Sequence, residues 1–168
     1  NAAPMTLPPV RIPARFNGPP GSANGGYSSG LFTAAAQRLL RADQSDGPDL
    51  SPDYPSPEQP FTVTLKLPPP LDTPLSVTGP ADPAERAPES NDQPVISVSD
   101  GPRLIATVTP AATPLTATAG PPVSYDEALA NQSNYPGFTR HPYPTCYVCG
   151  TERPDGMRLF PGRRPDVD

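Results

Sequence analysis

The stretch FNGPPGSANGGYSSGLFTAAAQRLL, residues 16–40, decides the fold, because a glycine-rich loop runs directly into an apolar helical pattern. Apolar residues recur at four-residue spacing in two adjacent rows: Tyr27, Leu31, Ala35 and Leu39 in one, and Phe32, Ala36 and Leu40 in the other. Such spacing gives a helix one continuous apolar face. The pattern predicts a helix from about Gly25 to Arg41, slim enough to lie against a sheet.

The first turn of this helix is expected to expose its backbone. Ser22 or Asn24 is placed to cap the helix, and Gly25 and Gly26 leave the first amides uncovered by side chains. Unpaired N–H groups at a helix start carry a partial positive charge. The loop therefore predicts uncovered backbone with a partial positive charge at the start of the helix.

Composition predicts one modest core with long, loose connections. Proline and glycine supply 30 and 13 of the 168 residues, which approaches the content of low-complexity chains. The net charge of -5, with 12 basic against 17 acidic residues and no basic cluster, argues against a nucleic-acid surface. Neither a membrane-spanning run nor a signal peptide is recognisable, so we expect a cytoplasmic protein. The sequence starts at Asn1 without an initiator Met, so we also expect a segment of a longer protein.

Alternating residues predict several strands. The clearest is 61–67, where apolar residues alternate with Thr62, Thr64 and Lys66. A hairpin is expected around Asp100-Gly101, with its pairing weakened or bulged by Pro102. Further strands are expected at residues 11–16, 75–78, 96–99 and 104–108.

The remaining segments read as connections. Proline-rich, polar sequence at 43–60, 79–93 and 110–122 predicts loops and linkers. Ser124, followed by Glu127 three residues later, predicts a short capped helix. From Asn134 onward the chain is expected to be irregular.

Several blocks together resemble the thioesterase-like hotdog proteins of actinobacterial type. They are RFNGPPGSANGGYSSGL at 15–31, LKLPPPLDTPL at 65–75, SDGPRLIATVTP at 99–110, PPVSYDEA at 121–128, HPYPTCYVCG at 141–150 and GMRLFPG at 156–162. The resemblance implies an α+β fold, a single hotdog half whose antiparallel sheet wraps one central helix. Residues 1–110 would form that half, and residues 111–168 would lead toward a second half that this sequence lacks.

The same resemblance implies an acyl-CoA thioesterase-like protein, with acyl-CoA or another acyl thioester bound beside the helix. Gly25 and Gly26 would donate to the thioester carbonyl, Asn24 would orient water or the carbonyl, and Tyr27 would line the acyl tunnel. Asp72 is the candidate general base. The structural alternatives are that Asn24 only caps the helix and that Asp72 only starts a turn before Pro74.

Cys146 and Cys149 form a C-x-x-C that admits three interpretations: half a zinc site, a redox pair or a tight turn. Zinc needs about four ligands, and only His141 could add a third. The interpretation we favour is two small, partly buried side chains in a loop, with no metal. His141 itself is expected to be a loop residue.

Two functions from different classes remain open, and neither calls for a cofactor. One is an acyl-CoA thioesterase or acyl-thioester-binding protein, and the other is a noncatalytic acyl-binding or protein-interaction module. Because a hotdog sheet leaves an edge unpaired, we expect a second hotdog half or a homodimer as partner.

Overall fold

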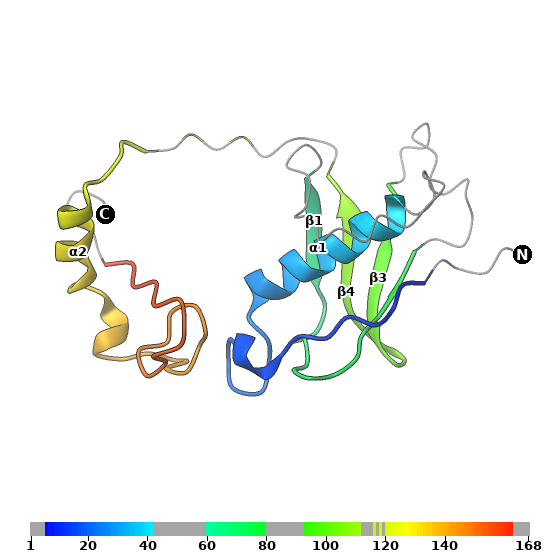
Figure 1. Ribbon diagram of the computed structural model, residues 1–168, viewed down its shortest axis with the longest axis horizontal. Helices are drawn as coiled ribbons and strands as arrows, with labels where there is room; N and C mark the ends of the chain where they lie inside the picture. The colour runs from blue at the N-terminus through cyan, green and yellow to red at the C-terminus, as the bar shows by residue number, and fades with distance from the viewer. Residues whose placement is uncertain are drawn as a thin grey trace, which may run out of the picture.

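The computed structural model describes residues 6–41, 60–79, 93–111, 116, 118 and 120–162. Within them a four-stranded antiparallel sheet has helix α1 (Gly25–Arg41) packed across one face (Figure 1). The strand order in the sheet is β1-β4-β3-β2. The strands are β1 (Phe61–Leu65), β2 (Ser76–Thr78), β3 (Ile96–Asp100) and β4 (Arg103–Pro110). The predicted α+β class, the helix and these four strands are confirmed.

The core lies between α1 and the sheet. Val63 and Ile96 both sit opposite Val108 in the register, which puts the three side chains on the same face of the sheet. Phe32 of α1 is fully buried against this face, in one cluster with these strands. Thr62 and its neighbours of the same parity face away from the core, so the alternation in the sequence marks the inner face correctly.

The hairpin of β3 and β4 is irregular. Gly101 adopts φ +53° in the turn, a conformation that an L side chain rarely takes. The register shifts between Val98 and Ser99, close to the turn that contains Pro102. The two pairs nearest the turn, Ser99 with Leu104 and Asp100 with Arg103, keep their register, so the bulge lies farther from Pro102 than expected.

The predicted strand at 11–16 is wrong. The extended segment lies earlier in the chain, where Thr6 pairs with Thr78 and Val10 with Leu75 along the outer side of β2. Pro13 then starts a 3-10 turn, η1 (Ala14–Phe16), closed by the N–H of Phe16 on the carbonyl of Pro13 at 2.9 Å. Pro13 therefore ends the extended course of this segment.

The C-terminal part has little regular structure. Helix α2 (Tyr125–Gln132) begins at Ser124, whose hydroxyl accepts the N–H of Glu127 at 3.2 Å as predicted. A 3-10 turn, η3 (Pro136–Phe138), follows, and Phe138 and Phe160 pack ring against ring at 5.0 Å. The predicted loops at 43–60 and 79–93 lie almost wholly outside the described residues, and the linker at 110–122 lies partly outside them.

Substituting one leucine in each helix tests which helix contributes to the core. Leu39 of α1 is 2% exposed, whereas Leu129 of α2 is 51% exposed. Leu39→Ala leaves a cavity between helix and sheet, so we expect about 2–5 kcal/mol of destabilisation in urea unfolding followed by circular dichroism. Leu129→Ala is the matched control and should cost less than about 0.5 kcal/mol. Equal losses for the two variants would contradict the assignment of the core.

Candidate functional site

Asn24 caps the first turn of α1. Its side-chain Oδ1 accepts a hydrogen bond from the N–H of Tyr27 at 3.1 Å. Its carbonyl oxygen accepts the N–H and the hydroxyl of Ser28, at 2.9 and 2.8 Å. Ser22, the other predicted cap, donates its N–H to the preceding turn instead. Asn24 is therefore the cap, and the fully buried Ser28 is satisfied by it.

The backbone N–H groups of Gly25 and Gly26 have no hydrogen-bond partner among the described residues. They are the first two helical amides, for which a helix supplies no acceptor. A Cβ on Gly25 would lie 3.6 Å from Cδ1 of Leu65, whereas Gly26 is exposed. Two amide donors thus lie at a boundary between apolar side chain and solvent, at the positive end of α1.

Tyr27 belongs to a small aromatic cluster centred on Phe16. Its ring stacks on Phe16 with centroids 3.8 Å apart, and Phe16 meets Tyr147 edge-on at 4.9 Å. The N–H of Tyr147 donates to the carbonyl of Asn17 at 2.9 Å. The ring of Tyr27 therefore contacts the loop before α1, and through Phe16 it is linked to the C-terminal segment.

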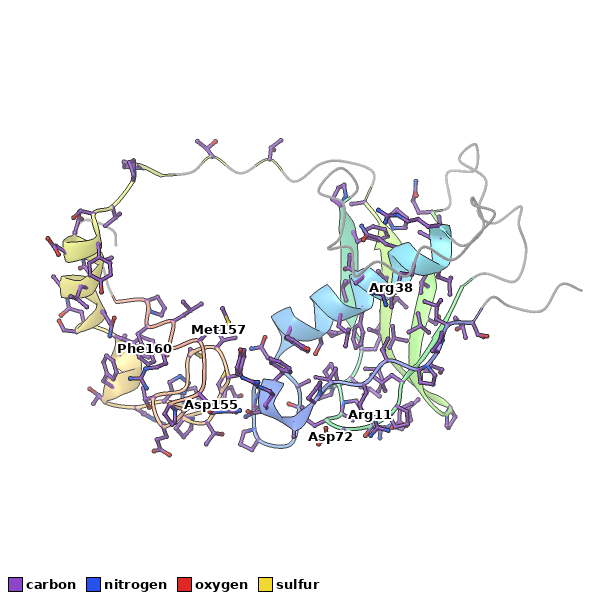
Figure 2. The ribbon with its side chains drawn as sticks, viewed as in Figure 1. Arg11, Arg38, Asp72, Asp155, Met157 and Phe160 are labelled. Carbon is purple, nitrogen blue, oxygen red and sulfur yellow. The ribbon has the colours of Figure 1, made fainter. Side chains whose placement is uncertain are left out.

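Asp72 holds the segment that precedes α1. It has φ 51°, its carboxylate accepts the N–H of Ala14 at 3.1 Å, and its N–H donates to Ile12 at 2.8 Å. The guanidinium of Arg11 donates to its carbonyl oxygen, and Figure 2 shows these two residues next to each other. Among the described residues, its hydrogen bonds all go to this segment and none to the amides of Gly25 or Gly26.

A junction that the sequence analysis missed joins residues 143–157 to the loop before α1. Arg153 donates to the carbonyl oxygens of Arg15 at 2.7 Å and Thr145 at 3.2 Å, and to Oδ1 of Asn17. Asp155 orients the guanidinium by accepting from its Nε at 2.7 Å. Asn17 and Arg153 are 136 positions apart, and no spacing pattern in the sequence links them.

The two cysteines lie in this junction as free thiols, in the turn that the sequence predicts. Cys146 is buried and Cys149 half-buried. The Nδ2 of Asn24 approaches Sγ of Cys146 at 3.9 Å. Burial raises the pKa of Cys146. Hydrogen bonds from the N–H groups of Cys149 and Val148, and from the side chains of Cys149 and Asn24, outweigh this effect, so the pKa is lowered.

Metal binding finds no ligand set in the part of the chain that the structure describes. No group of three or more His, Cys, Asp or Glu side chains there is arranged to hold a metal ion. The Nδ1 of His141 accepts the N–H of Tyr143 at 2.9 Å, which occupies one of its nitrogens.

No described helix is both long and apolar enough to cross a bilayer.

Comparison with known proteins gives one weak structural likeness. No protein-family model matches this sequence, and no match was found among curated proteins. A probable thioesterase from Bartonella henselae superposes with a TM-score of 0.42 and 11% sequence identity. The superposition covers 66% of this chain and 87% of that one. A likeness of this size does not establish a common fold.

The cap can be separated from the other contacts of Asn24 by substitution. Asn24→Ala removes the acceptor for the N–H of Tyr27 and should destabilise the protein by about 1 kcal/mol. Asn24→Ser keeps a capping oxygen but lacks the Nδ2 donor, and should stay within about 0.5 kcal/mol of the wild type. Urea unfolding measures both, and an equal loss in the two variants would show that the cap is not what stabilises the turn.

The ion pair of Arg153 and Asp155 predicts a pH dependence for the junction. The hydrogen bond from Arg153, together with its charge, lowers the pKa of Asp155. A lowered carboxyl pKa stabilises the junction above the ordinary pKa of about 3.9, and this stabilisation is lost as pH falls through the lowered value. Carbon-13 NMR titration should show the Asp155 midpoint below the ordinary value in the wild type and close to it in Arg153→Met. Identical midpoints would contradict the pairing.

Proposed function

We propose that the chain is a thioesterase-like protein of the hotdog type that binds an acyl thioester, such as acyl-CoA, at the N-terminal end of α1. The observation that carries this proposal is the pair of unpartnered amides of Gly25 and Gly26, beside the side chain of Leu65. A thioester carbonyl oxygen can accept from both amides. The positive end of a helix favours the negative charge that the oxygen gains as the thioester is attacked.

The edge of the sheet at β1 supports the hotdog assignment. Strand β1 pairs only with β4, so one of its sides is left without a strand partner among the described residues. An unpaired edge of this kind favours pairing with another chain or domain. We propose that a second copy of the chain, or a second hotdog half, covers this edge, and that residues 1–110 form the first half.

Hydrolysis requires a general base in addition to the amide donors. Asp72 remains the candidate from the sequence, yet its carboxylate accepts from the N–H of Ala14 and, among the described residues, makes no hydrogen bond to the first turn of α1. This geometry favours a second candidate function, a module that binds the acyl thioester without cleaving it. In the hydrolytic version, the attacking water would be activated by a carboxylate that the partner brings to the amides.

Replacing Gly25 by proline tests the amide donors directly. Proline is favoured at the first helical position and lacks the N–H, so Gly25→Pro deletes one donor while keeping the helix. Gly25→Ala is the matched control, because it keeps the N–H and adds a Cβ at ordinary contact distance from Leu65. Binding of acyl-CoA is measured by calorimetry, and turnover by release of free CoA thiol.

We expect Gly25→Pro to weaken acyl-CoA binding about ten-fold, as for the loss of one hydrogen bond, and Gly25→Ala to bind like the wild type. If the wild type turns the substrate over, the proline variant should lose about a hundred-fold or more in rate. Saturable binding without turnover would select the noncatalytic module. Absence of acyl-CoA binding by the folded wild type, or equal affinity of the two variants, would reject the site.

A further inference from the structure

The thiol of Cys146 is surrounded by hydrogen-bond donors. Its Sγ accepts from the N–H groups of Cys149 and Val148, and Nδ2 of Asn24 lies 3.9 Å away. The thiol of Cys149 also donates to it. The hydroxyl of Tyr135 donates to the carbonyl oxygen of Cys149 at 3.4 Å. The donors around Cys146 favour negative charge on its sulfur.

The two thiols are therefore unequal. Burial raises the pKa of both, but for Cys146 the donors reverse the effect and lower it. For Cys149, burial is reinforced by the neighbouring Cys146, and its pKa stays raised. The guanidinium of Arg153 interacts electrostatically with Cys146 as well, which further favours the anion. Negative charge is therefore favoured on Cys146 and disfavoured on Cys149.

The backbone of the turn that carries the two cysteines is closely packed. The N–H of Gly150 donates to the carbonyl oxygen of Cys146 at 2.8 Å. A Cβ on Gly150 would lie only 2.4 Å from the carbonyl oxygen of Pro144 and 2.5 Å from that of Cys146. Only glycine fits there, so the turn is closely packed around the cysteines.

We propose that Cys146 and Cys149 form a peroxide-reactive dithiol, in which Cys146 is the attacking residue and Cys149 the resolving one. The Cys146 thiolate attacks an oxygen of a hydroperoxide, the O–O bond breaks, and the departing oxygen takes a proton. This gives an alcohol, or water from hydrogen peroxide, and a sulfenic acid on Cys146. The Cys149 sulfur then attacks Cys146, forming the S–S bond and releasing water that carries the proton of Cys149. The dithiol loses two electrons and the hydroperoxide gains them.

Burial selects a small oxidant for this site. Cys146 is 5% exposed, so a hydroperoxide fits it better than a bulky disulfide. A bound metal is the competing use of two such thiols. It requires further ligands, and the described residues bring no third one into place.

The experiment treats the reduced full chain with hydrogen peroxide and follows intact mass and cysteine peptides. In the wild type we expect the loss of two hydrogens, a disulfide between Cys146 and Cys149 within one chain, and recovery of the starting mass with dithiothreitol. Cys149→Ser lacks the resolving thiol, so it should accumulate a sulfenic acid on Cys146 that dimedone traps. Cys146→Ser leaves only Cys149, whose pKa is raised, and should oxidise at least about ten-fold more slowly.

The wild-type disulfide and the Cys149→Ser adduct do not depend on the folding of Cys146→Ser, so they decide the matter even if that variant unfolds. Preferential trapping at residue 149 in the wild type, or reaction of Cys146 no faster than free cysteine, would overturn the proposal. Disulfides found only between chains would also overturn it. So would about one zinc ion per chain in the purified protein, with both thiols unreactive until a chelator removes it.

Discussion

The packing of α1 on the sheet is the contact on which the other features depend. Phe32 and Ala36 are fully buried there, and the small side chain of Ala36 lets the helix approach the strands closely. At the far end of the helix, a Cβ on Gly79 would lie 2.3 Å from Cδ2 of Leu39, so any larger residue there would have to displace the Leu39 side chain. Burial along the whole face fixes where the first turn of α1 is presented.

That first turn is held from several directions at once. The N–H of Asn24 donates to the carbonyl of Phe16 at 2.8 Å, and the N–H of Ala23 donates to the carbonyl of Pro69 at 2.9 Å. The segment that contains Arg153 supports the loop before α1, because Arg153 donates to the carbonyl of Arg15. Asp155 of the same segment is labelled in Figure 2. Amides that must act without rearranging benefit from such support, because donors fixed in advance need no reorganisation when charge develops.

Local patterns in the sequence predicted the elements, whereas contacts between distant segments stayed hidden. The period of α1, the alternation at 61–65 and the Asp100-Gly101 turn are each encoded within a few residues, and the structure has all three. The extended segment near Val10 was misplaced, because its pairing with Leu75 depends on a residue far along the chain. Proline content alone could not tell whether Pro13 lies in a strand or ends it.

The candidate site shows the same division. Gly25, Gly26 and the capping residue Asn24 predict an exposed helix start, because capping depends only on residues within the first turn. The C-x-x-C spacing reports only that two sulfurs can meet. That Cys146 is the buried thiol beside α1 follows from the junction made by Arg153 and Tyr147, which no period or motif encodes. For the same reason Asp72 could be named as a base from its block but not positioned.

Asn24 links the start of α1 to the cysteine turn, because its one carboxamide contacts both. The oxygen of the group accepts from the N–H of Tyr27 and so fixes which way the amide faces, leaving the nitrogen directed at Cys146. A capping serine or aspartate would satisfy the helix equally well but would present no donor to a thiolate. Helix capping therefore does not account for asparagine over these residues, whereas contact with the cysteine turn does. The start of α1 and the thiol of Cys146 are thus linked through one side chain, that of the residue which caps the helix just before Gly25 and Gly26.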